Sequence, residues 1–551
     1  EKPPVSLPTL PDPFVLGVMP PTVQVLMDEG LQGSPTLNAA VENTLAYRKG
    51  IESRKAFFLP RLDLRLYQSR EQAHGGDVSG VTNDKGIQLT LSYNLYRGGA
   101  DKALERKAVE EAEQAHDLQI KACRDVRQTL SIAYSDVQSI ASQQRYQEIV
   151  GFGANISDAS AWLIQHRMNA AQRSALLQDL FGKPPGIGLS FTRLTIGASD
   201  FSQSHYALDD VPPGQTDYPL EKFSIEPMRS SVLPVVKTAL AINPQLQVMA
   251  SPWSAPAWMK TTDSLMQGTL RPQAYDAFAR YLVRYVDAMQ AEGVATYALT
   301  LQNEPHFEPK DYPGMRLDPA TRATLIGKHL GPLLAKRAPT VRILDWDHNW
   351  DEPQSPLQVL ADPVARPFVA GVAWHCYAGE VSAQTKVHEA HPDKETFFTE
   401  CSGGAWKPHW QETLPWFMRH LIIGTTRGWA KGVLLWNLAL DENHGPHLGG
   451  CGDCRGVVTI NSKTGEVTRN FDYYALAHAS RFVRPGARRI ASTTDVDGIE
   501  TVAFQNSDDR SIALVKLNSS PQARKYSVGF AGRNFAHPMP GASVATFVWT
   551  P

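Results

Sequence analysis

The stretch TYALTLQNEP, residues 296–305, decides the fold class of most of this chain. Residues 297–301 form an apolar run of strand length, and the run stops at Asn303 and Glu304. A carboxylate at the end of a buried strand is costly unless it has a partner or a function. We therefore interpret the stretch as a core strand whose carboxyl end carries chemistry.

Seven other segments repeat this pattern of an apolar run that ends in polar or aromatic side chains. They are residues 147–156, 188–197, 246–253, 341–350, 369–379, 396–404 and 431–440. Stretches with helical character separate them, such as Gln273–Glu292, Pro319–Lys336 and Gln411–Thr426. Eight strands alternating with helices predict an α/β protein with a parallel (β/α)8 barrel over residues 146–475. Short alternating segments after Tyr473 predict a β-sandwich side domain over residues 476–551.

The ends of the predicted strands carry the candidate site residues, because chemistry in such barrels takes place at the carboxyl ends of the strands. Besides Asn303 and Glu304, these residues are Asp200, Trp253, His375, Tyr377, Glu400, Trp436 and Asn437. Glu304 and Glu400 follow the fourth and seventh strands, so they can face each other across the barrel mouth.

Two facing carboxylates among aromatic rings are what glycoside hydrolysis requires. One acid protonates the leaving oxygen, and the other attacks the anomeric carbon or activates water. A single Glu at a strand end is more simply explained by a salt bridge. A pair at matched strand ends among aromatic side chains favours catalysis.

Composition excludes several other classes of function. The 551 residues predict two or three domains, and a net charge of −2 gives no general attraction to nucleic acid. The sequence has no P-loop and no dinucleotide-binding glycine motif, so we expect no cofactor. Among five cysteines, Cys451-x-x-Cys454 lacks a second ligand pair. This favours a local disulfide or two free thiols over a metal site.

Residues 1–145 differ from the rest of the chain in the pattern of their apolar residues. A helix is predicted from Thr36 to Phe58, and period-two alternation follows in residues 61–70 and 86–99. From Leu104 to Ile140 an apolar side chain recurs about every 3.6 residues, within a stretch free of Gly and Pro that runs from residue 100 to 150. This is the period of one long amphipathic helix.

Motifs from about residue 146 to the C-terminus resemble glycoside hydrolase family 30, in particular its glucosylceramidase branch. The motifs are GFGANISDASAWLI, GIGLSFTRLTIGASDFS, ASPWSAPAWMKT, LTLQNEP, GVAWHCYAG, FFTECSGG, WNLALDENHGP and CRGVVTI. The resemblance implies a retaining β-glycosidase acting on glucosylceramide-type substrates. A β-1,6-glucan or a β-xyloside is the alternative substrate within the same family.

The resemblance also implies roles for individual residues. Glu304 corresponds to the acid/base, Glu400 to the nucleophile, and Asn303 to the partner of the sugar 2-hydroxyl. Sugar binding is implied for Asp200, Trp253 and Trp436, and support of the carboxylates and pocket floor for Arg193, His375, Tyr377 and Asn437. Retention implies carboxyl groups roughly 5–5.5 Å apart and a higher pKa for Glu304 than for Glu400. The first strand of the family's side domain is missing or replaced here, which predicts an exposed sheet edge.

Residues 22–140 resemble one repeat of the TolC-like outer-membrane efflux proteins, through FFLPRLDL and SYNLYRGGADKAL. Members of that family carry two repeats, and this chain has one. The resemblance implies association with a bacterial envelope, and a secreted, periplasmic or outer-membrane location. It also leaves open a function of another class, in which the chain is a trimeric envelope module with a passive hydrolase domain.

Overall fold

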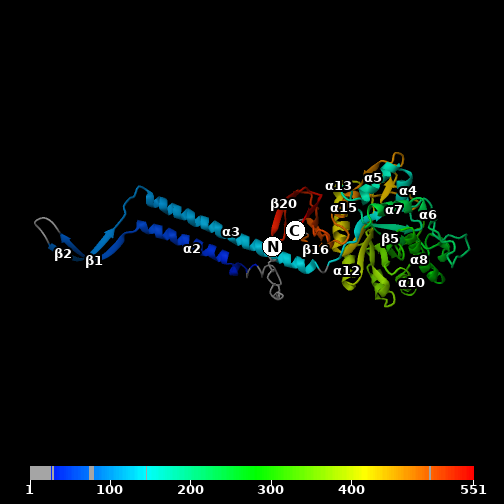
Figure 1. The fold of residues 1–551 in the computed structure, drawn as a ribbon, viewed down its shortest axis with the longest axis horizontal. Helices are drawn as coiled ribbons and strands as arrows, with labels where there is room; N and C mark the ends of the chain where they lie inside the picture. Colours follow the sequence, from blue (N-terminus) through cyan, green and yellow to red (C-terminus); the bar gives the residue numbers. More distant parts are fainter. Residues whose placement is uncertain (1–26, 28–29, 74–79, 144–145, 495–497) are drawn as a thin grey trace, which may run out of the picture. The chain divides into compact units, whose positions relative to one another are not determined.

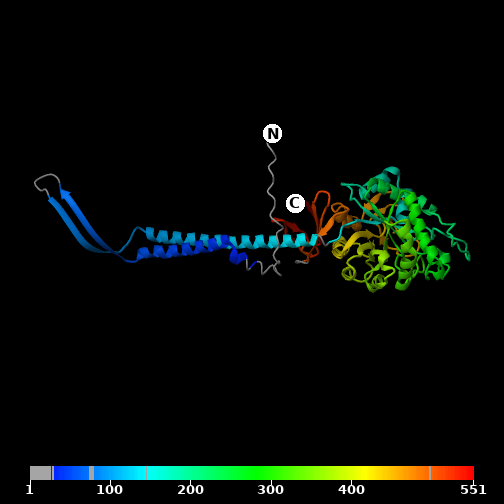
Figure 2. The ribbon, with the colours of Figure 1, turned by 60° about the horizontal axis from the view of Figure 1, so that its bottom comes forward.

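The computed structural model describes residues 27, 30–73, 80–143, 146–494 and 498–551. These residues fall into two compact units. One unit consists of the described residues up to 138 together with residues 529–534. The other consists of the described residues in 139–528 and 535–551. Figure 1 and Figure 2 show the elements of each unit, which we describe in turn.

The first unit is built on two antiparallel helices, α2 (Pro35–Lys55) and α3 (Ala100–Gln143). Ser34 caps α2 by accepting a hydrogen bond from the backbone of Leu37. The helices pack closely because small alanine side chains of α3 are buried, and Thr44 donates from α2 to the carbonyl of Ala115, at 3.1 Å. Helix α3 ends at Gln143, although the stretch without Gly and Pro continues to residue 150. The chain at residues 147–149 joins a sheet instead.

A two-stranded hairpin lies beyond these helices, formed by β1 (Arg61–Ala73) and β2 (Gly80–Ser92). The short helix η1 (Ala56–Phe58) connects α2 to it. Cross-strand pairs bring apolar side chains together on one face, namely Leu62 with Leu91, Leu64 with Leu89 and Leu66 with Ile87. All six of these side chains are more than half exposed. No helix in the described part of the chain is both long and apolar enough to span a membrane.

The second unit contains the predicted (β/α)8 barrel. Its strands in closed order are β3 (Gly151–Asn155), β4 (Phe191–Ile196), β5 (Gln247–Pro252), β6 (Thr296–Thr300), β7 (Arg342–Asn349), β8 (Val369–His375), β9 (Glu395–Glu400) and β11 (Ala430–Leu435). All neighbours are parallel, and β11 pairs with β3 to close the cylinder. Side chains such as Phe191, Met249 and Leu344 form a compact cluster of their own, so the barrel is a packed core.

Helices lie around the barrel (Figure 1). The principal ones are α4 (Asp158–His166), α5 (Ala170–Phe181), α7 (Val232–Ile242), α8 (Tyr275–Ala291), α11 (Gln354–Ala361), α12 (Ser382–Ala390) and α15 (Phe471–Ser480). Two predicted helices contain a central π-helical turn. One runs through α9 (Pro319–Thr324), η4 (Leu325–Leu330) and α10 (Gly331–Arg337), and the other through α13 (Trp410–Phe417), η6 (Met418–Gly424) and α14 (Thr425–Arg427). The expected domain boundary at residues 475 and 476 falls inside α15.

The side domain is a four-stranded antiparallel sheet with a two-stranded partner. The first sheet has the order β16 (Arg488–Ile490), β17 (Ile499–Gln505), β18 (Ile512–Asn518), β21 (Ser543–Trp549), and the second is β19 (Arg524–Phe530) with β20 (Arg533–Met539). The expected exposed edge at β16 is partly covered. The backbone of Ile149 donates to Ala487 at 2.7 Å, and Arg489 donates to Gln147 at 3.2 Å. Residues 147–149 thus replace part of the missing strand.

Candidate active site

Three predicted site residues lie at the carboxyl ends of barrel strands. His375 ends β8 and Glu400 ends β9, and the two residues are register partners. Glu304 follows β6 in a left-handed backbone conformation with φ of 48°, which is uncommon for a residue with a Cβ. Strain of this kind is concentrated at functional sites, where the surrounding structure holds it.

Arg193 of β4 connects the predicted nucleophile to its neighbours. Its buried guanidinium donates to Oε2 of Glu400 and to Oδ1 of Asn303, both at 2.6 Å, and to Oδ2 of Asp347 at 2.7 Å. The same group lies 4.7 Å from the ring centre of Trp253. Because Oδ1 of Asn303 is occupied by Arg193, the amide nitrogen of Asn303 remains the group that can donate to a ligand.

Asp347 of β7 is a site residue that the sequence interpretation missed. Its carboxylate accepts hydrogen bonds from Arg193, Ser251, Thr300, His375 and Thr399. Burial raises the pKa of Asp347, but the charge of Arg193 and the hydrogen bonds from His375 and Thr399 hold it far below its ordinary value. The available signal was a carboxylate in the middle of a buried strand, since such a group needs partners.

Two histidines face Glu304. Nδ1 of His375 lies 3.2 Å from Oε1 of Glu304, and Nδ1 of His348 lies 3.6 Å from the same oxygen. Burial raises the pKa of Glu304, but the adjacent His348 and His375 outweigh it and lower the pKa to about 2. Glu304 is therefore a carboxylate in the substrate-free protein, and the expected order of the two glutamate pKa values stays a prediction. His348 was also missed from sequence, because it lies within the segment assigned to strand β7.

His375 has a carboxylate on each ring nitrogen. Nε2 lies 3.0 Å from Oδ1 of Asp347 and 3.9 Å from Oε2 of Glu400, while Nδ1 faces Glu304. Burial lowers the pKa of His375, but the charge of Glu400 and the hydrogen bonds to Asp347 and Glu304 raise it to about 9. The ring is an imidazolium at neutral pH, and it bridges both predicted catalytic residues.

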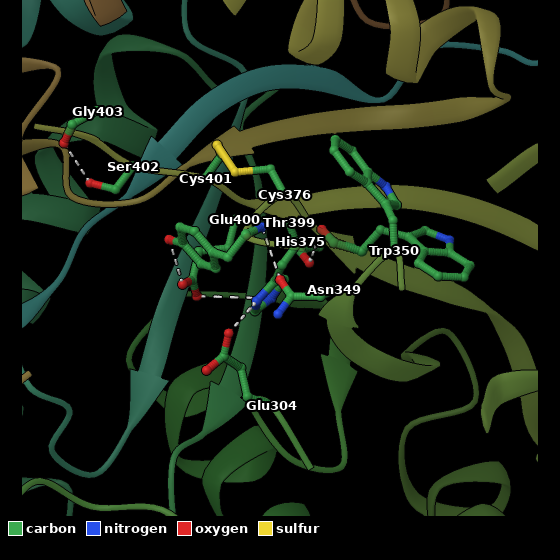
Figure 3. The surroundings of a disulfide bond; sticks show 12 residues. Glu304, Asn349, Trp350, His375, Cys376, Thr399, Glu400, Cys401, Ser402 and Gly403 are labelled. Atoms are coloured by element: carbon green, nitrogen blue, oxygen red, sulfur yellow. Dashed lines mark hydrogen bonds and ion pairs between the residues drawn. A yellow bond between two sulfur atoms is a disulfide. The ribbon is translucent and has the colours of Figure 1, made fainter. Parts of the chain in front are cut away.

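Glu400 is held from its other side by Tyr377. The phenol of Tyr377 donates to Oε1 of Glu400 at 3.0 Å, and Arg193 occupies Oε2. A disulfide joins Cys376 to Cys401, the residues that directly follow His375 and Glu400. Figure 3 shows this disulfide beside the carboxylates. The second disulfide joins Cys451 to Cys454, which is one of the two alternatives that the sequence left open.

The remaining predicted residues form an aromatic and polar wall. The rings of Trp253 and Trp436 stack at 5.0 Å with an interplanar angle of 23°. Burial and the charge of Glu400 raise the pKa of Asp200 well above its ordinary value, so this carboxyl tends to keep its proton. Asn437 is oriented by Ser157, which donates to its Oδ1 at 2.6 Å, and its expected support of the pocket floor stays a prediction.

Glu304, His348 and His375 also have the spacing of a metal site. Ligand atoms of Glu304, His348 and His375 lie within 4.8 Å of one another. However, both nitrogens of His375 face carboxylate oxygens, which fits a doubly protonated ring better than a metal ligand. We therefore assign the group to proton handling.

A parallel barrel that presents two carboxylates from its fourth and seventh strands, beside stacked tryptophans, has the features of a glycoside hydrolase. The model of the glycosyl hydrolase family 30 TIM-barrel domain matches residues 149–483, and that of the family 30 beta sandwich domain matches residues 486–547. The chain belongs to glycosyl hydrolase family 30. A model named outer membrane efflux protein matches residues 26–149, in agreement with the second resemblance.

Similar proteins distinguish between the branches of the family. The endo-1,6-beta-D-glucanase of Neurospora crassa is 35% identical over 390 residues, which cover 68% of this chain and 79% of that protein. The solved structure of the endo-beta1,6-glucanase BT3312 is 35% identical, with a TM-score of 0.69 over 74% of this chain and 92% of that one. The lysosomal acid glucosylceramidase of Mus musculus is 27% identical and covers 75% of this chain and 83% of that protein. The similarity to glucosylceramidases is thus present but weaker than the similarity to β-1,6-glucanases.

Proposed function

We propose that this chain is a retaining β-1,6-glucanase that uses Glu400 as nucleophile and Glu304 as acid/base. The observation that carries the proposal is the 35% identity to two β-1,6-glucanases, on a site in which one imidazolium contacts both glutamates. Glucosylceramide, the first expectation from sequence, becomes the second candidate because relatives named as glucosylceramidases or putative glucosylceramidases, such as those of Mus musculus and Caenorhabditis elegans, are 27% and 30% identical.

In the first step, Glu400 attacks the anomeric carbon while the glycosidic oxygen gains a proton and leaves. Arg193 and Tyr377 each donate a hydrogen bond to one oxygen of Glu400, and the two contacts fix the orientation of the carboxylate. The attacking carboxylate exchanges these hydrogen bonds for a bond to carbon.

The proton for the leaving group belongs to the pair formed by Glu304 and His375. In the free protein it resides on His375, and the 3.2 Å contact gives a direct path to Oε1 of Glu304. As the leaving oxygen gains negative charge, the proton moves from Nδ1 to Glu304, whose carboxyl group passes a proton on to that oxygen. In the second step Glu304 takes a proton from the attacking water and passes a proton back to Nδ1 of His375, which restores the starting ion pair.

The wall residues bind the sugar that becomes attached to Glu400. The amide nitrogen of Asn303 donates to its 2-hydroxyl, because Arg193 fixes the orientation of the amide. Asp200 hydrogen-bonds to hydroxyl groups farther from the reacting carbon. Trp253 and Trp436 supply aromatic faces for the C–H face of the ring.

A comparison of substrates tests the proposal. We expect linear β-1,6-glucan to be hydrolysed, with little release from glucosylceramide, xylan or β-1,3-glucan, and with the β-anomer as the first product in proton NMR. The Glu400→Gln protein is the inactive control. Release of glucose from glucosylceramide without cleavage of β-1,6-glucan would contradict the substrate, and an α-anomeric first product would contradict retention.

A location outside the cytoplasm is a second proposal. Two disulfides favour an oxidising compartment, and the match to an outer membrane efflux protein model supports association with an envelope. Membrane fractionation of the expressing bacterium tests this, with a soluble monomer in the cytoplasmic fraction as the contrary result.

A further inference from the structure

We infer that the disulfide between Cys376 and Cys401 is a positioning device for the nucleophile, which it acts on through Tyr377. The inference rests on the proposed function, since it concerns the residue proposed as nucleophile. Neither cysteine touches the reacting atoms.

The disulfide lies where barrel pairing between β8 and β9 stops. The last register pair of the two strands is His375 with Glu400, and the register shifts immediately before it. The residue that follows each strand is a cysteine, and the Cα atoms of the two cysteines are 5.4 Å apart. The covalent link therefore continues the strand pairing by one residue beyond the point where hydrogen bonds end (Figure 3).

The Cys401 side of the link is rigid. Cys401 is 1% exposed, and its carbonyl accepts a hydrogen bond of 2.8 Å from the backbone of Trp436 at the end of β11. Cys401 is thus held by the barrel core, and through the disulfide it holds Cys376, which is only half-buried.

Tyr377 needs such support. Its side chain is 46% exposed, so packing contributes less to its position than it does for the other site residues. Its backbone donates to Oδ1 of Asn349 at 3.0 Å, and its phenol reaches Oε1 of Glu400. Because Cys376 is held in place, the backbone of the next residue, Tyr377, has fewer conformations. The phenol then loses less conformational freedom when it binds Glu400.

The functional consequence concerns the orientation of Glu400. With both oxygens occupied, the carboxylate has one orientation, and small errors in reacting geometry cost up to about 100-fold in rate. Without the disulfide we expect the Tyr377 bond to be made only part of the time. Glycosylation of Glu400 should then be slower by about 10- to 100-fold, while substrate affinity changes less.

A double-mutant cycle tests the inference. Tyr377→Phe is measured in the native protein, in Cys376→Ala/Cys401→Ala, and in Cys451→Ala/Cys454→Ala as the matched control lacking the other disulfide. The readout is the rate constant for labelling of Glu400 by a 2-deoxy-2-fluoro-β-glucosyl inactivator, followed by mass spectrometry well below the unfolding temperature of every variant. If the disulfide acts through Tyr377, Tyr377→Phe slows labelling about 10-fold in the native and control proteins and less than about twofold in Cys376→Ala/Cys401→Ala.

An equal effect of Tyr377→Phe in all three backgrounds would overturn the inference, because a purely structural disulfide predicts independence. A crystal structure of Cys376→Ala/Cys401→Ala gives a readout that needs no activity. Retention of the 3.0 Å contact between Tyr377 and Glu400 would also overturn it. Labelling of Glu400 without cleavage of β-1,6-glucan would reject the proposed substrate alone. If the native protein is not labelled, the proposed nucleophile is rejected. In that case the crystal structure still decides whether the disulfide positions Tyr377.

Discussion

Nδ1 of His375 lies 3.2 Å from Oε1 of Glu304, and the opposite nitrogen of the same ring lies 3.0 Å from Asp347. The proposed acid/base is therefore paired with an imidazolium that a second, deeply buried carboxylate keeps charged. If this pair of side chains shares one proton and acts as the proposed general acid, the pH dependence of the reaction should report the pair.

The first prediction concerns the basic limb of the pH profile. The pair loses its proton as pH rises through the pKa of His375, which is about 9, so kcat/KM should fall near that pH. His375→Gln should lower kcat and remove this limb.

The conformational stability of the native protein should also depend on pH through the protonation of His375. The folded-state pKa is raised above 6.5, so the stabilisation by protonated His375 is complete below pH 6.5 and is lost as pH rises toward 9.

On the acid side the sign is opposite. The pKa of Glu304 is lowered from 4.5 to about 2, so its contribution to stability is present above pH 4.5 and is lost as pH falls toward 2. Denaturant unfolding from pH 7 to pH 3 should therefore show a smaller loss of stability in Glu304→Gln than in the native protein. A parallel loss in both proteins would contradict the ion pair.

Replacement of the proposed nucleophile should nearly abolish turnover. Glu400→Gln keeps the shape of the side chain but cannot form the glycosyl ester, so kcat should fall by at least about 1,000-fold. In Glu400→Gly, added azide should restore the reaction of an activated β-glucoside and yield the α-glucosyl azide. A β-glucosyl azide from this variant would contradict the assignment of Glu400.

Replacement of the proposed acid/base should depend on the leaving group. Glu304→Ala should lose about 100-fold or more on β-1,6-glucan, whose leaving oxygen needs a proton. It should lose much less in the glycosylation of Glu400 by a dinitrophenyl β-glucoside, whose leaving group departs unprotonated. Azide should give the β-glucosyl azide here, and equal losses on both substrates would argue against Glu304 as acid.

Asp347 should contribute to both stability and activity. Asp347→Asn leaves the buried Arg193 and His375 with one fewer counter-charge, and breaking a buried ion pair costs about 3–5 kcal/mol. Asp276→Asn removes the exposed pair with Arg280, and this control should cost less than about 1 kcal/mol. Urea unfolding measures both variants, and similar costs would contradict a central role for Asp347.

Local sequence was sufficient for the eight barrel strands and for the two glutamates. Strand signals are apolar runs of limited length, and each run here ends in a polar or aromatic residue that the barrel places at one rim. The sequence was insufficient for Asp347 and His348, which lie inside the segment WDHNW. The partners of Asp347 come from strands β4, β5, β6, β8 and β9, and His348 faces Glu304; these partners are distant in the sequence.

The sequence by itself thus determined the architecture and the place of the two glutamates at the carboxyl ends of strands, because both depend on periodicity and on residue type at strand ends. Tertiary structure decided the charge states and the link between Cys376 and Cys401. A pKa depends on the distance to groups brought together by folding, and a disulfide depends on the separation of two Cα atoms. Sequence spacing specifies neither of these distances.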